Sequence, residues 1–216
     1  NASIPEALIE EIVRQSKELG IYIIAVFGGE PFHPLTRDRV FDLAQRHPEV
    51  EVVVCTNATF IDSEVAERIS QQSNMFVLIS LDGFEENNDV RRGRGVFNKV
   101  SEAMRELKKR RALFGISTNV TTDNADEVFA DDFINFVSRG GAHLLYCNPL
   151  ITNNGATNVV DTDEYIEAAQ RLKKNGLANR LFVFDGILGN ITTRRLREKT
   201  ELHVEVNGDV SVQRGT

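Results

Sequence analysis

The stretch IYIIAVFGGEP, at residues 21–31, decides the fold of this 216-residue chain. Its apolar part, Ile21–Phe27, is a near-continuous run typical of a parallel strand covered on both faces. Four short motifs follow this run and three later ones: Gly28-Gly29-Glu30-Pro31, Thr56-Asn57 after Val52–Cys55, Ser80-Leu81-Asp82-Gly83 after Met75–Ile79, and Asn119-Val120-Thr121 closing Phe114–Asn119. Strand C-termini in an alternating β/α protein open onto one ligand-binding face, so these motifs are expected to converge in space.

Patterns of helical period separate the apolar runs. One of them is the apolar stripe formed by Phe97, Val100, Met104 and Leu107. Repeated βα units predict an α/β fold with a parallel sheet and right-handed crossovers, curled into a full or partial barrel or left open.

The end of the chain has a different pattern. Residues 202–212 predict a β-hairpin, because Asn207-Gly208 tolerates the positive φ angles of a type I′ turn. We therefore expect a barrel domain over residues 1–180 and a C-terminal extension over residues 181–216.

Composition excludes several classes of protein. The net charge of −7 argues against a nucleic-acid-binding surface. The sequence has neither a run of apolar residues long enough to span a membrane nor the pattern of a signal peptide, so we expect a cytoplasmic protein without a membrane partner. Two cysteines, Cys55 and Cys147, fit a reducing compartment, and each is expected to be a small strand residue in the core.

The first motif suits a ligand that carries an ammonium group. Gly28 and Gly29 remove side chains where the chain turns, which lets a ligand approach the backbone, and Glu30 adds a carboxylate. An ordinary strand-to-helix turn with a solvated Glu30 is the competing interpretation. Thr56-Asn57 contributes short polar groups that also cap or close turns.

The third motif suits a carboxylate. Ser80 ends an apolar strand, and Arg91, Arg92 and Arg94 follow in a predicted glycine-containing loop, where guanidinium groups can form bidentate contacts. The alternative is a solvated loop in which Arg92 pairs with the nearby Asp89 on the surface.

In their order and spacing, these motifs resemble those of the radical S-adenosylmethionine (radical SAM) superfamily, in its peptide- and protein-modifying branch. By that resemblance Glu30 holds the ammonium of S-adenosylmethionine, and Ser80 with Arg92 holds its carboxylate. The backbone near Val120 and Thr121 would contact the adenine. The resemblance thus implies a cofactor site made of Gly28, Gly29, Glu30, Asn57, Ser80, Arg92, Val120 and Thr121.

The resemblance also implies a fold and an activity. The fold would be a partial (β/α)6 TIM-like barrel without its first strand and cluster loop. The intact enzyme, an oxidoreductase with a [4Fe-4S] cluster, would cleave S-adenosylmethionine reductively and start radical chemistry on a peptide, protein or small-molecule substrate. Its electron donor would be a protein such as flavodoxin or ferredoxin. Neither a catalytic residue nor a metal ligand of this chain follows from the resemblance.

One departure from the family matters. The loop with cysteines spaced C-x3-C-x2-C would precede Ser3, so the chain as given lacks the thiolates that hold the cluster. We expect either that this segment precedes Asn1, that it was removed, or that the protein is a degenerate SAM-binding domain without catalysis. A barrel lyase that acts on an anionic metabolite is a further alternative, although no strand ends in an obvious Schiff-base lysine or histidine base.

Overall fold

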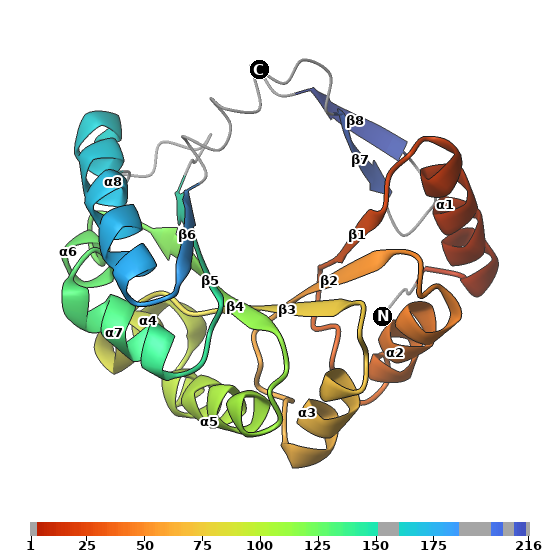
Figure 1. The fold of residues 1–216 in the computed structure, drawn as a ribbon, viewed down its shortest axis with the longest axis horizontal. Coiled ribbons are helices and arrows are strands. Elements are labelled where there is room, and N and C mark those ends of the chain that lie inside the picture. The colour runs from red at the N-terminus through yellow and green to blue at the C-terminus, as the bar shows by residue number, and fades with distance from the viewer. Residues whose placement is uncertain (1–3, 151–159, 186–199, 205–209, 215–216) are drawn as a thin grey trace.

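The fold is an open six-stranded parallel sheet with helices on its outer side. The computed structural model describes residues 4–150, 160–185, 200–204 and 210–214. The strands lie side by side in the order in which they occur in the chain (Figure 1). They are β1 (Ile23–Val26), β2 (Glu51–Thr56), β3 (Met75–Ser80), β4 (Phe114–Val120), β5 (Leu144–Pro149) and β6 (Phe182–Asp185).

Helices connect successive strands and lie along the convex side of the sheet, as Figure 1 shows. They are α1 (Glu6–Glu18), α2 (Arg37–Arg46), α3 (Ser63–Ser70), α4 (Glu85–Arg92), α5 (Val96–Lys109), α6 (Ala125–Val128), α7 (Asp131–Arg139) and α8 (Thr162–Ala178). The predicted α/β partial barrel is therefore confirmed. The four motifs lie at the carboxyl ends of its first four strands.

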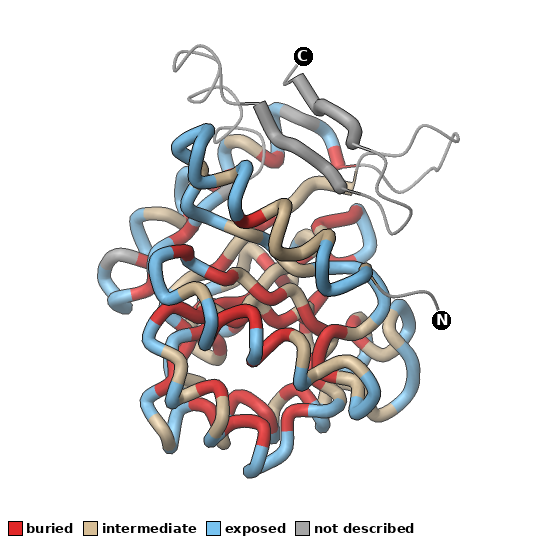
Figure 2. Tube along the Cα trace, turned by 90° about the vertical axis from the view of Figure 1, so that its right-hand side faces the viewer, coloured by how far each residue is buried: buried red, intermediate tan, exposed pale blue. Residues whose placement is uncertain are grey.

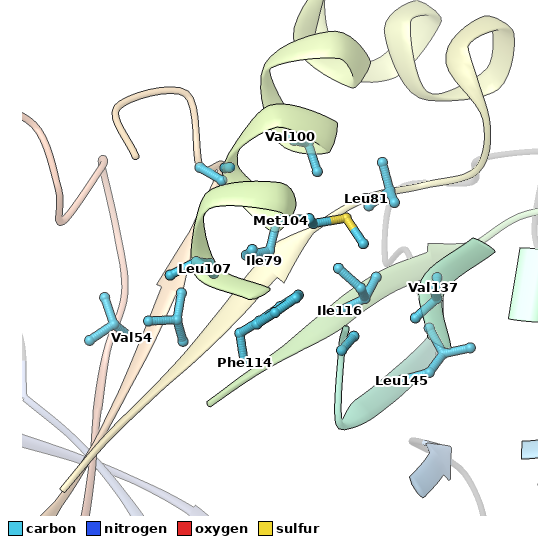
Figure 3. Packing of buried hydrophobic residues seen from close by; sticks show 14 of the residues in the cluster. Val54, Ile79, Leu81, Val100, Met104, Leu107, Phe114, Ile116, Val137 and Leu145 are labelled. Atoms are coloured by element: carbon cyan, nitrogen blue, oxygen red, sulfur yellow. The ribbon is translucent and has the colours of Figure 1, made fainter. Parts of the chain in front are cut away.

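The core lies between the sheet and these helices. Alternate strand residues, such as Val54 and Ile79, are fully buried against Met104 and Leu107 of α5 (Figure 3). The burial colouring of Figure 2 shows buried residues in the interior of the described chain and exposed ones on its outside. Because strand side chains alternate between faces, the half-exposed residues between the buried ones lie on the concave side.

The first strand departs from the sequence prediction. Ile21–Phe27 was expected to be covered on both faces, but β1 is shorter, forms the edge of the described sheet and leaves Ile23 63% exposed. Its apolar run resembles a central strand because Ile24 and Val26 pack against the core on the helix-covered side, while Ile23 and Ala25 are exposed on the concave side. Hydrophobicity alone does not distinguish these two environments.

The predicted hairpin is present as β7 (Thr200–Val204) and β8 (Val210–Arg214), which pair antiparallel with Leu202 opposite Val212. The expected Asn207-Gly208 turn lies outside the described residues. The domain division at residue 180 stays a prediction, and β6 continues the parallel sheet beyond it. None of the helices in the described part of the chain has the length and hydrophobicity needed to cross a bilayer.

Candidate functional site

The Glu30 carboxylate is fixed at the C-terminal ends of β1 and β2. Gly28 and Gly29 have φ angles of +91° and +57°, which glycine tolerates and which turn the chain after β1. Glu30 Oε1 then accepts hydrogen bonds from Thr56 Oγ1 at 2.6 Å and Phe32 N at 3.1 Å, and Oε2 accepts one from Asn57 N at 2.9 Å. No Lys or Arg of the described residues forms an ion pair with it, so its carboxylate can accept an external cation.

The Thr56-Asn57 pair holds Glu30 in a way that the sequence did not reveal. Thr56 is 3% exposed, and its hydroxyl also accepts a hydrogen bond from Ala58 N at 2.9 Å. Asn57 contacts Glu30 only through its backbone amide, because its Oδ1 accepts from the amide and hydroxyl of Thr59. Thr56, which was not among the predicted site residues, is thus the side chain that orients Glu30.

Ser80 is the last residue of β3 and is half-buried. Its neighbours in the strand alternate, and Ile79 on the helix-covered side is fully buried, so Ser80 lies on the concave side. Within the described part of the chain, its hydroxyl makes no hydrogen bond that would compete with a ligand. The predicted role of Ser80 in binding a carboxylate stays a prediction.

Arg91 and Arg92 lie in the last turn of α4, and not in a loop as the sequence predicted. Their cationic side chains are favourable at a helix C-terminus, while Glu85 and Glu86 are favourable in its first turn. The helix escaped prediction because it has no apolar stripe: its one aliphatic side chain, Val90, is 84% exposed.

Arg92 pairs with Asp82, and not with Asp89 as the competing interpretation held. Arg92 Nε lies 2.8 Å from Asp82 Oδ2, although its N–H bond is not directed at that oxygen, and Arg91 Nε lies 3.3 Å from the same atom. The Asp82 side chain is completely buried, whereas 21% of Arg92 is exposed. The surface-pair interpretation is therefore wrong, and Arg92 is held close to the end of β3.

Asp89 binds backbone amides at the start of α5 instead of Arg92. Its carboxylate accepts hydrogen bonds from Phe97 N at 2.8 Å and from Gly95 N, at the start of α5. These backbone donors hold the pKa of Asp89 below its ordinary value, and the Phe97 amide contributes most to the shift. Asp89 thus links α4 to α5.

A buried polar network joins the ends of β3 and β4. Asp82 Oδ1 accepts from Asn119 N at 2.8 Å, and Asn124 Nδ2 donates to the carbonyls of Asp82 and Asn119. At Thr121 the amide donates to Asn124 Oδ1, and the carbonyl accepts from the amides of Asn124 and Ala125. The main-chain atoms of Thr121 are therefore already engaged, and the adenine contact predicted for Val120 and Thr121 stays a prediction with no direct structural support.

The concave side of the sheet also carries apolar groups. Tyr146 on β5 and Phe184 on β6 lie there with ring centroids 5.3 Å apart, and Phe182 is 60% exposed. Such a surface suits a substrate with apolar parts.

The two cysteines do not fit an iron–sulfur cluster. Cys55 is half-exposed on the concave side of β2, where burial raises the pKa of its thiol, whereas Cys147 is fully buried in the core on the other side of the sheet. In addition, no three His, Cys, Asp or Glu side chains of the described residues converge as a metal site. No ligand set for a cluster is found in the described residues.

The sequence profile described as "Radical SAM superfamily" matches residues 2–131. The mycofactocin maturase MftC of Mycolicibacterium smegmatis is 31% identical over 137 residues, which are 62% of this chain and 34% of that protein. The AdoMet-dependent heme synthase of Methanosarcina barkeri is 29% identical over 123 residues, 55% of this chain and 34% of that protein. The chain thus spans about a third of the length of these relatives.

Solved structures share the fold. Streptococcus suis SuiB bound to its precursor peptide SuiA superposes with a TM-score of 0.77 at 14% identity, over 97% of this chain and 53% of SuiB. SuiB bound to S-adenosylmethionine gives a TM-score of 0.70 at 15% identity, over 86% of this chain and 44% of SuiB. A profile match over more than half of the chain, on a sheet whose strand ends carry the Glu30 and Arg92 arrangements, shows that the chain belongs to the radical SAM superfamily.

Proposed function

We propose that this chain is the S-adenosylmethionine-binding core of a radical SAM enzyme that acts on a peptide. The observation that carries the proposal is Glu30, an anionic side chain held by three hydrogen bonds at a strand end and without a cationic partner among the described residues. In this role Glu30 accepts hydrogen bonds from the ligand ammonium, while Ser80 and Arg92 bind the carboxylate.

S-adenosylmethionine supplies this superfamily with the sulfonium bond that is cleaved to start radical chemistry. The described residues of this chain contribute binding and orientation. Because the described cysteines do not hold a cluster, we assign no step of the reaction to a cluster on this chain. An electron donor such as flavodoxin or ferredoxin and a cytoplasmic location stay predictions.

The peptide is favoured by the SuiB neighbour, which was solved with a precursor peptide, and by the apolar concave face around Tyr146 and Phe184. The likeness to a heme synthase supplies the second candidate, a tetrapyrrole. Titration with an iron porphyrin, followed by Soret absorption, separates the two. A saturable shift at micromolar porphyrin would replace the peptide with a tetrapyrrole.

The binding proposal is tested with Glu30→Gln, which keeps the shape of the side chain and removes its charge. We expect its affinity for S-adenosylmethionine, followed by NMR titration, to fall by about 1–3 kcal/mol, the usual range for a charge-assisted hydrogen bond. Glu102→Gln is the control, because Glu102 is 70% exposed on the outer helix α5. Equal affinity of the Glu30 variant and the unmodified chain would remove Glu30 from the site.

A further inference from the structure

We infer that Asp82 is a positioning residue: its buried carboxylate holds the Arg92 guanidinium in place to bind the carboxylate of S-adenosylmethionine. This inference rests on the proposed function. Asp82 was not among the predicted site residues, and its side chain is too deeply buried, with no exposed surface, to contact a ligand itself.

The two oxygens of Asp82 have separate partners. Oδ1 accepts a hydrogen bond from Asn119 N at 2.8 Å, which fixes the carboxylate to the end of β4. Oδ2 lies 2.8 Å from Arg92 Nε and has no aligned hydrogen-bond donor among the described residues. One carboxylate therefore connects the Arg92 side chain on α4 to the neighbouring strand.

The backbone of Asp82 is equally constrained. Its amide donates to Asn88 Oδ1 at 3.1 Å, and its carbonyl accepts from Asn124 Nδ2 at 2.8 Å. Gly83 follows with a φ of +126°, and a Cβ there would lie 2.1 Å from Glu127 Oε2. These contacts leave the carboxylate little freedom, so the position of Arg92 is defined before any ligand binds.

The charges favour a second anion at this place. Two guanidinium groups, those of Arg91 and Arg92, share the single carboxylate of Asp82, which leaves an excess of positive charge. The Arg92 Nη atoms make no hydrogen bond to the described residues, so they remain available for a bidentate contact. Ser80 lies two residues before Asp82 and supplies a hydroxyl at the same strand end.

The test compares two probes on the 216-residue chain, and both are titrated by NMR. S-adenosylhomocysteine has the amino-acid carboxylate, and 5′-methylthioadenosine lacks the whole amino-acid part. We expect Asp82→Asn to weaken S-adenosylhomocysteine binding about tenfold or more and to leave 5′-methylthioadenosine binding within about twofold, because only the first probe uses Arg92. Glu106→Gln is the matched control: it breaks another carboxylate–arginine pair, with Arg110, at the C-terminal end of α5.

Each other outcome is decisive. Equal loss of both probes, or unchanged binding of S-adenosylhomocysteine, would reduce Asp82 to a structural residue and leave the proposed function intact. If the unmodified chain binds neither probe, the proposed function itself fails. Should Asp82→Asn not fold by its NMR spectrum, Asp82→Glu, which keeps the charge but displaces it, must show the same selective loss, and failure of both variants to fold would overturn the inference.

Discussion

At the scale of single residues, the site depends on side chains that orient other side chains. Ser80 directly follows an apolar run, and Glu30 follows another after Gly28 and Gly29, so the sequence predicts that both lie at strand ends. Thr56 and Asp82 were missed in these roles because each acts on a residue of another element: Thr56 on Glu30, and Asp82 on Arg92. The first pair depends on β1 and β2 being neighbours, and the second on the position of α4 beside the end of β3. Neither arrangement can be derived from the spacing of the motifs in the sequence.

Thr56→Val tests this arrangement in the folded state. The substitution keeps the shape of the side chain but removes the hydroxyl that donates to Glu30 at 2.6 Å and accepts from Ala58 N at 2.9 Å. We expect the free energy of unfolding, measured in urea, to fall by about 1–3 kcal/mol, since a buried backbone amide loses its acceptor. Thr56→Ser retains the hydroxyl and serves as the control, and equal stability of Thr56→Val and the unmodified chain would contradict the described bonds.

At the scale of elements, α4 is a helix that the sequence analysis did not predict. An apolar stripe predicts α5, but α4 is held by charges and end contacts, with Gly93 at its C-terminus in a positive-φ conformation. Acidic residues at its start, arginines at its end and a following glycine were the features that could have identified it. The helix matters because it carries Arg92 and also supplies Asp89 to α5.

Asp89 makes the α4–α5 junction sensitive to pH. The N-cap residue of α5 is Gly95, which has no side chain to cap the helix, and the Asp89 carboxylate binds the free amides instead. Since the pKa of Asp89 is lowered in the folded state, its stabilising contribution is complete above the ordinary value of about 4 and is lost as the pH falls through the folded value.

Asp89→Asn should therefore be less stable than the unmodified chain at pH 7, and this difference should shrink below about pH 4. Urea unfolding of both proteins across this range measures it. A difference that stays constant with pH would mean that the Asp89 charge contributes nothing to the junction.

At the scale of the whole molecule, the sequence predicted the sheet and the helices that have an apolar stripe, because their hydrophobic residues recur with the period of a strand or a helix. The sequence analysis overestimated how much of β1 is buried, since an edge strand with one packed face can be as apolar as a central strand. The positions of Cys55 and Cys147 on opposite faces also belong to this scale, because only the assembled sheet separates them.

This separation predicts the outcome of cluster reconstitution. When this chain is incubated anaerobically with iron and sulfide, we expect no stable cluster absorption, because its two cysteines cannot together ligate one cluster. Iron and sulfide analysis with visible absorption measures the result. A stoichiometric four-iron cluster on this chain would contradict the ligand assignment.

The strand order has a consequence for how the protein is made. Paired residues of neighbouring strands are only 23 to 38 positions apart, from Val52 with Met75 to Leu144 with Phe182. Each strand is therefore the next strand to leave the ribosome after its pairing partner. The sheet can thus grow in one direction during synthesis. The described partners of Glu30, Asp82 and Arg92 all lie at or before Asn124, so the site can assemble while β5 and β6 are still untranslated.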